Sequence, residues 1–145
     1  MYSLLIIPVL VGFITQILKL AFDGIPNNLN WRHLFFSYGG MPSSHTAFVS
    51  SLATVIALRE GINSGAFAVA LILMVLVIRD AAGLRVELGR NAKLTNQLAR
   101  EIYKGKDSKF TPLREQVGHT SVQIIAGFVI GVGLAALFYW LFLIF

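Results

Sequence analysis

Apolar residues gather in four long runs separated by shorter polar stretches. A helix needs about 20 residues to cross the hydrocarbon core of a bilayer. The first and last runs reach that length, whereas the third is short for a span. The pattern predicts an all-α integral membrane bundle of about four transmembrane helices in a single domain. The predicted spans lie at about residues 2–22, 43–58, 65–80 and 121–145 of the 145-residue chain.

A long polar segment, residues 81–118, separates the third run from the fourth. Large apolar residues recur in it at mostly four-residue spacing, with charges between them. This predicts an amphipathic helix on the cytoplasmic side, at the membrane interface or against the bundle. We expect a turn at 104–109 and then another short helix that starts at Thr111-Pro112, with proline at its first position. The spaced apolar residues are Leu84, Leu88, Leu94, Leu98 and Ile102.

Small residues mark where helices approach closely. The second run is rich in them, which favours packing inside the bundle over exposure to lipid. The fourth run contains Gly127 and Gly131, a GxxxG pattern typical of close helix contacts. We interpret this face as the candidate contact of a homodimer. Thr120 and Gln123 fit a capping box at the start of the same helix.

Composition supports a membrane location. Apolar residues make up 56% of the chain and charged residues only 13%, against a usual charged fraction of about 25% in soluble proteins. A chain this small cannot bury so many apolar side chains in one core, so the bilayer is the expected solvent. No cysteine is present, which excludes disulfides and thiolate metal sites.

The positive charges are unevenly placed. Nine of the twelve Lys and Arg residues lie between Arg79 and Arg114. In a membrane protein such a block marks the cytoplasmic side, and it does not indicate a nucleic-acid partner. With four spans, both termini are then outside, together with the nearly neutral loop at Arg59-Glu60. The expected location is the plasma (inner) membrane.

This orientation brings polar groups from different spans to one membrane face. The starts of spans two and four carry His45 and His119, and the end of span three carries Asp80, with Arg85 just beyond it. Ionisable groups at membrane depth are functional candidates. One histidine could act as a nucleophile and the other as a general acid.

The stretch before span two suits an anion. A helix N-terminus offers free N–H groups and a positive dipole end, and Ser43 and Ser44 add hydroxyl groups. Arg79 and Arg85 are candidates to clamp phosphate oxygens. The alternative is ordinary structural chemistry: serines that cap a helix, arginines that anchor the interface, and Asp80 paired with a nearby arginine.

Three blocks of sequence occur in a specific order: "GGMPSSHTAF", "RDAAGLRVELGRNAKLTNQL" and "REQVGHTSVQIIAGFVIG". Together they resemble the divergent, small membrane branch of the phosphatidic acid phosphatase type 2 superfamily, which includes vanadium haloperoxidases. The resemblance extends from Gly39 to Gly131. It implies that His119 attacks phosphorus to form a phosphohistidine and that His45 is the general acid. It also implies a lipid phosphate or related phosphomonoester as substrate, no metal or cofactor, and inhibition by vanadate.

The chain departs from the superfamily pattern at several positions. Ser44 stands where the superfamily has glycine. Leu113 stands where an arginine is usual six residues before the histidine, with Arg114 one place away. Gln123 stands where an aspartate normally orients the histidine.

The superfamily's first motif, a lysine and an arginine followed by proline, is absent. Lys19 and Arg32 are the candidates to replace it. Asp80 is the candidate for the missing carboxylate, and Arg85 for the missing guanidinium.

Three hypotheses follow for the function. The first is a membrane phosphatase whose site faces the cytoplasm. The second is a non-catalytic membrane protein that binds phosphate or anionic headgroups in the same pocket. The third is a purely structural helical bundle. Turnover of lipid phosphates by the purified protein separates the first from the other two.

Overall fold

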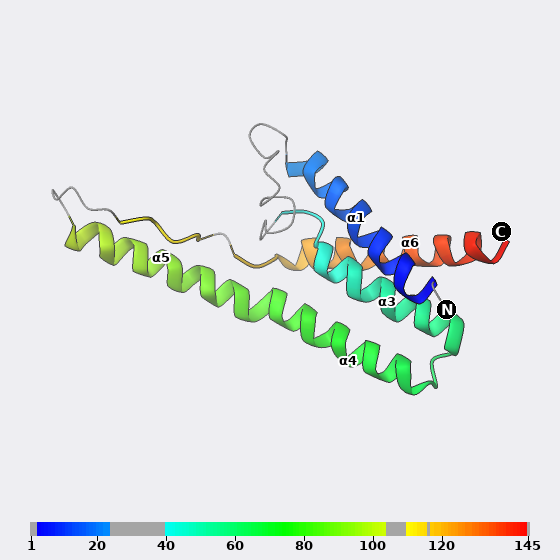
Figure 1. Ribbon diagram of the computed structural model, residues 1–145. Coiled ribbons are helices and arrows are strands. Elements are labelled where there is room, and N and C mark those ends of the chain that lie inside the picture. Colours follow the sequence, from blue (N-terminus) through cyan, green and yellow to red (C-terminus); the bar gives the residue numbers. More distant parts are fainter. Residues whose placement is uncertain (1–2, 24–39, 104–109, 116, 145) are drawn as a thin grey trace.

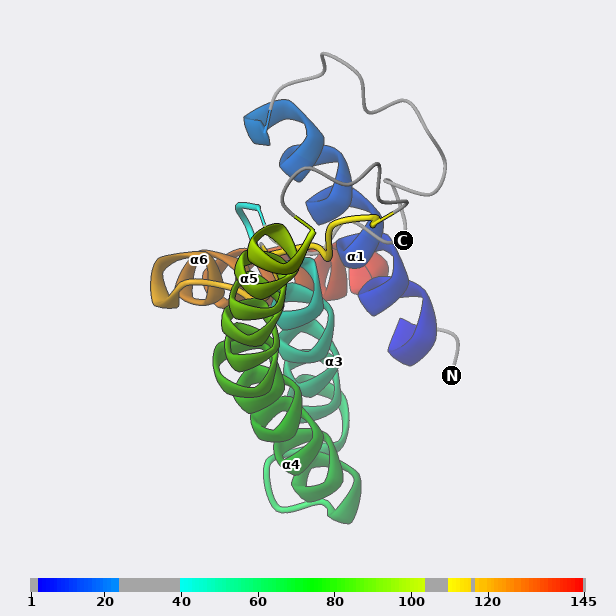
Figure 2. The same ribbon diagram turned by 90° about the vertical axis from the view of Figure 1, so that its left-hand side faces the viewer.

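The computed structural model describes residues 3–23, 40–103, 110–115 and 117–144, and over these residues the protein is a helical bundle without strands. Figures 1 and 2 show its helices from two directions. The all-α prediction is confirmed. The elements are α1 (Ser3–Asp23), α3 (Ser44–Glu60), α4 (Gly65–Arg79), the π-helical turn η1 (Asp80–Leu84), α5 (Arg85–Ile102) and α6 (Ser121–Ile144).

Helix α3 is the centre of the bundle, because α1, α4 and α6 all pack against it. Its small side chains let these neighbours come close. A core cluster of fully buried residues joins α3 to α1 and α6. Its members are Ile7, Val11, Ala47, Val55 and Ala135.

The hydroxyl groups of Ser50 and Ser51 in α3 donate to carbonyl groups of the same helix. Ser50 Oγ donates to the carbonyl of Ala47 at 3.2 Å, and Ser51 Oγ donates to that of Phe48 at 2.7 Å. A polar group in a membrane core needs such a partner, since neither water nor lipid tails supply one there. The hydroxyls therefore do not prevent a small-residue helix from occupying the middle of the bundle.

The closest helix contact is made by α6. A Cβ atom placed on Gly127 would overlap the backbone oxygen of Ser43, and one placed on Gly131 would overlap Ser50 Oγ and lie 2.5 Å from the oxygen of Ala47. The predicted close contact through the GxxxG pattern is confirmed. Its partner, however, is α3 of the same chain. The homodimer stays a prediction, and in this structure Gly127 and Gly131 themselves are covered by α3 and the residue before it.

Helices α4 and α5 form one long rod (Figure 1). The apolar run ends at Arg79, as the sequence indicates, but the helix continues through η1 into α5. The prediction of an amphipathic helix is confirmed. Its packing along the bundle is not found, because α5 extends away from the bundle and contacts mainly η1. Its large apolar side chains stay exposed, with Leu88 60% and Ile102 70% accessible.

The segment after α5 returns along the side of that helix. The amide of Asn96 donates to the carbonyl of Leu113 and accepts from its N–H, both at 2.8 Å. Residues 110–115 are not helical, so the prediction of a short helix from Thr111-Pro112 is wrong. The Asn96 side chain supplies the hydrogen bonds that a helical turn would otherwise make. The predicted turn at 104–109 lies outside the described residues.

Two described helices are long and apolar enough to cross a membrane, Gly65–Ile102 and Ser121–Ile144, and Ser3–Lys19 is a shorter apolar helix. At about 1.5 Å per residue, the 24 residues of α6 cover about 36 Å. The fold is that of a helical membrane bundle. The four-span topology stays a prediction.

The glycine contact gives a test with a matched control on the same helix. Gly131→Ala should lower the free energy of unfolding by about 1–3 kcal/mol, because the methyl group overpacks against α3. Gly133→Ala should leave stability unchanged or raise it by up to about 1 kcal/mol, since no atom lies within 4 Å of the added methyl group. Thermal unfolding in detergent measures both. Equal midpoints for the two variants would contradict this packing.

Candidate functional site

The polar ends of four elements meet at one end of the bundle. Lys19 lies near the end of α1, His45 in the first turn of α3, Arg85 at the junction of η1 and α5, and His119 just before α6. Their charges are close enough to act on one another: Lys19 and Arg85 both influence the imidazoles of His45 and His119. The structure thus brings together the polar groups that the sequence placed on one face.

His119 is held by its backbone as well as by its side chain. It is buried, with 7% of its surface accessible. Its N–H donates to the carbonyl of Ala81 in η1 at 3.1 Å. The preceding Gly118 has φ of +103°, and a Cβ there would lie 2.9 Å from the backbone nitrogen of Val86. Only glycine fits this turn, so Gly118 fixes where the histidine enters the site.

Gln123 orients the imidazole of His119. Its Oε1 accepts the backbone N–H of Thr120 at 2.9 Å, and the hydroxyl of Thr120 accepts the N–H of Gln123 at 3.4 Å. The predicted capping box is therefore present. The same Oε1 lies 3.3 Å from His119 Nδ1. Since the Thr120 N–H requires an acceptor at that position, Nδ1 is the donor in the second contact and Nε2 keeps its lone pair.

The neutral form of His119 is favoured by its surroundings. Burial lowers the pKa of its imidazole below the usual 6.5, and the positive charges of Lys19 and Arg85 add to this effect together with His45. The hydrogen bond to Gln123 raises the pKa and offsets part of the decrease. At pH 7 the ring is therefore neutral, which is the form that a nitrogen nucleophile needs.

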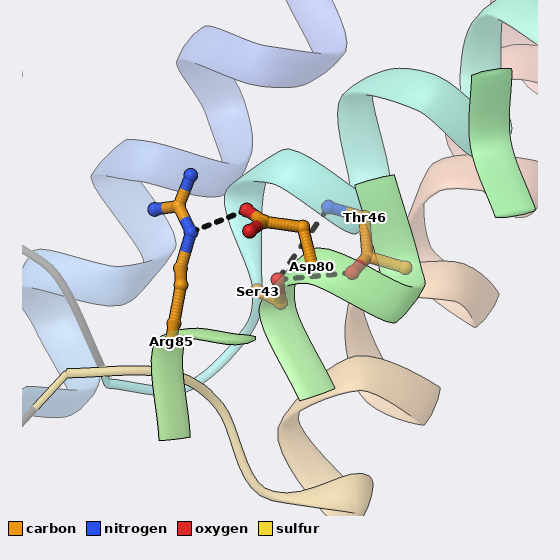
Figure 3. A network of polar contacts seen from close by, with 4 residues as sticks. All are labelled: Ser43, Thr46, Asp80 and Arg85. Carbon is orange, nitrogen blue, oxygen red and sulfur yellow. Dashed lines mark hydrogen bonds and ion pairs between the residues drawn. The ribbon is translucent and has the colours of Figure 1, made fainter. Parts of the chain in front are cut away.

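The π-helical turn positions Asp80 and Arg85. In a π-helix the backbone pairs residues five apart, and here the N–H of Arg85 bonds the carbonyl of Asp80. Their side chains also meet, with Arg85 Nε 2.6 Å from Asp80 Oδ2 (Figure 3). The carboxylate of Asp80 thus orients the guanidinium of Arg85. Among the described contacts it is Gln123, and not Asp80, that holds His119.

Ser43 has a structural position. It is fully buried, and its hydroxyl oxygen caps α3 by accepting from the N–H of Thr46 at 3.4 Å and from the hydroxyl of Thr46 at 3.0 Å (Figure 3). Its own N–H donates to the backbone oxygen of Gln123 at 3.1 Å. This bond ties the helix start that carries His45 to the helix start that follows His119.

The remaining predicted cations differ in their position. Lys19 is buried, with 3% of its surface accessible, and belongs to the site. Arg79 and Arg114 are exposed, and the described contacts do not bring either of them to the histidines. Arg32 lies outside the described residues.

The two histidines face different hollows. His119 lines a polar cavity of about 820 Å³ beside α5, together with Arg90, Lys93 and Gln123. His45 and Ser44 lie at the polar end of a groove of about 580 Å³ between α1, α3 and α4. No group of three or more His, Asp or Glu side chains in the described part of the chain is arranged to hold a metal ion.

Two features of this site could not be predicted from the sequence. The capping box was recognisable, but its second role, the contact of Gln123 with His119, depends on how the loop folds back. The carbonyl of Ala81 is available to His119 only because of the π turn. No residue pattern in the sequence predicted that turn.

Comparison with known proteins decides the family. The model of the divergent PAP2 family matches residues 2–134. The chain belongs to this family. It is also 34% identical, over a 140-residue alignment that covers 88% of each chain, to the uncharacterized membrane protein YuiD of Bacillus subtilis (strain 168). No solved structure matches the chain.

Membership of the divergent PAP2 family supports the assignment to the membrane and agrees with the motif blocks around His45 and His119. It leaves the reaction open, because the curated relative is uncharacterized.

The Gln123 contact gives a test by titration. Gln123→Glu should raise the pKa of His119, because a carboxylate at Nδ1 favours the imidazolium. In the unchanged protein the ring should titrate below 6.5, and stability should fall as the pH drops from 6.5 through that lower value. Ring resonances in detergent, assigned by their loss in His119→Asn, report both values. An unchanged pKa in Gln123→Glu would mean that residue 123 does not contact the ring.

Proposed function

We propose that this protein is a membrane phosphatase that hydrolyses a lipid phosphate or related phosphomonoester through a phosphohistidine at His119. The observation that carries the proposal is the meeting of two histidines and two cations at one end of the bundle. His119 is neutral, with Nε2 free to attack, and His45 comes from a different helix. Such a pair supplies a nucleophile and a proton donor to one phosphate.

In the first step, the lone pair of His119 Nε2 attacks phosphorus and the bond from phosphorus to the lipid oxygen breaks. The leaving oxygen takes a proton from the His45 imidazolium, the form that the negative charge of the bound phosphate favours, and departs as the lipid alcohol. In the second step, the oxygen of a water molecule attacks phosphorus, the bond from phosphorus to His119 Nε2 breaks, and the water gives its proton to the now neutral His45. Inorganic phosphate leaves, and both histidines return to their starting forms.

The cations stabilise the phosphate and the negative charge that develops on it. Arg85 is suited to this role because the ion pair with Asp80 already fixes its guanidinium. Lys19 adds a positive charge from the buried end of α1. Ser44 and the N-terminus of α3 supply further donors.

The positive-inside rule supports a site that faces the cytoplasm, because Arg85, Arg90 and Lys93 lie on the same end of the bundle as the histidines. The substrate would then present its phosphate in the cytoplasmic leaflet of the plasma membrane. Basic residues near a charged surface attract anionic lipid by about 1 kcal/mol each.

A second candidate function is the binding of phosphate or anionic headgroups without turnover. One observation favours it. The group that orients His119 is the uncharged amide of Gln123, while the carboxylate of Asp80 is bonded to Arg85. A neutral acceptor stabilises the imidazolium less than a carboxylate does, which makes catalysis slower.

Substitution of the histidines separates the two functions. His119→Ala should lower turnover of a long-chain phosphatidic acid by more than about a thousandfold, while vanadate still binds. His45→Ala should cost about 10²–10⁴-fold with this alcohol leaving group and much less with an aryl phosphate, which leaves without a proton. Arg114→Ala, at an exposed position outside the site, is the matched control. Equal turnover by the unchanged protein and His119→Ala would support the binding function instead.

The orientation can be tested by labelling, since the chain has no native cysteine. Arg100→Cys on α5 should react with a membrane-impermeant maleimide only after cells are opened. Asn63→Cys, in the turn between α3 and α4, should react in intact cells. The reverse pattern would place the site on the outer face.

A further inference from the structure

An apolar groove runs along the membrane part of the bundle from the site. Its floor is α3 and its walls are α1 and α4, which both pack on α3 and make few contacts with each other. Its volume is about 580 Å³. The lining is almost wholly apolar along the shaft, where the residues are Val9, Gly12, Phe13, Phe48, Leu73 and Val77.

The groove is open on its side. Phe13, Phe48 and Leu73 keep 51%, 40% and 43% of their surfaces accessible. In a bilayer this opening lies next to lipid chains, because α4 belongs to a helix apolar enough to cross the membrane. A hydrocarbon chain of a lipid can therefore enter the groove from the side without passing through water.

One end of the groove is polar. Gln16, Ser44 and His45 line it there, and the charges of Lys19 and Arg85 reach His45. A groove with an apolar shaft and a cationic end is complementary to an amphipathic anion, one that carries a phosphate on a hydrocarbon chain.

The arrangement of the histidines agrees with that occupant. In phosphoryl transfer the attacking and leaving atoms lie roughly in line on opposite sides of phosphorus. His119 lines the polar cavity, whereas His45 lies in the groove. A nucleophile on the polar side places the leaving oxygen on the side of His45, which is where the apolar groove begins.

We propose that this groove holds the hydrocarbon chain of the substrate, with the phosphate between His45 and His119 and the scissile oxygen beside His45. This inference rests on the proposed function and adds where the alcohol part of the substrate lies. After the first step the lipid alcohol leaves sideways into the bilayer.

The physical role of the groove is to position the hydrocarbon chain of the substrate. Lipid tails are as apolar as the groove, so moving a chain from the bilayer into it gains little hydrophobic free energy. Its effect comes from shape, by aligning the phosphorus–oxygen bond with the nucleophile. The groove should therefore distinguish long-chain from short-chain substrates mainly in kcat/KM.

The substitution Gly12→Leu tests whether the groove holds the hydrocarbon chain, because the leucine side chain fills the apolar part of the groove. A Cβ at Gly12 already lies 3.2 Å from the ring of Phe48, so a leucine side chain occupies the space proposed for the chain. For hexadecyl phosphate, kcat/KM should fall by at least about tenfold, whereas for butyl phosphate it should stay within about twofold of the unchanged protein. Gly133→Leu is the matched control, because position 133 is exposed on α6, and it should change neither value.

A binding measurement keeps the test independent of turnover and of folding in the variant. Hexadecyl phosphate with a mid-chain diazirine should cross-link the unchanged protein in nanodiscs mainly at Phe13, Leu73 and Val77. The matching hexadecanol probe should label these residues at least about fivefold less, since it lacks the anion that the cationic end attracts.

The outcomes separate the two proposals. Phosphate-dependent labelling of the groove without turnover of either substrate would leave the groove assignment standing and reject the phosphatase. Turnover with labelling centred on the outer face of α6, for example at Val129, would reject the groove and leave the phosphatase. Equal losses for hexadecyl and butyl phosphate in Gly12→Leu would also reject the groove.

Discussion

The close approach of α6 to α3 is the contact on which the rest of the molecule depends. Because Gly127 and Gly131 lack side chains, the backbone of α6 lies against Ser43, Ala47 and Ser50. At that distance the N–H of Ser43 reaches the carbonyl of Gln123. This bond sets the spacing between the helix starts next to which the two histidines lie. The separation of the imidazoles thus follows from a packing contact between small residues.

The π turn is the second constraint. An uninterrupted α-helix would place residues 80 and 85 on different sides, but the π turn lets Asp80 and Arg85 pair. It also presents the carbonyl of Ala81 to the N–H of His119. Short π-helical insertions often occur at functional sites, and here the insertion joins the rod of α4 and α5 to the loop that carries the candidate nucleophile.

The sequence predicted what depends on local patterns. Hydrophobic runs predicted the helices, the GxxxG pair predicted a close contact, and Thr120 with Gln123 predicted a helix start. It could not predict partners that are distant along the chain. Gly131 contacts α3 of its own chain, and Asn96 holds Leu113 in an extended segment where proline suggested a helix. In both cases a tertiary contact decides between local alternatives of similar free energy.

The oxygen of the Gln123 side chain is shared between the backbone of Thr120 and the ring of His119. Helix ends fray more readily than helix centres, and local opening costs less free energy than unfolding of the whole domain. If the first turn of α6 opens, the cap and the orientation of the ring are lost in the same event. Under mild heat or denaturant, the fixed orientation of the His119 ring should therefore be lost before the helical signal, because the turn that orients this ring is a helix end.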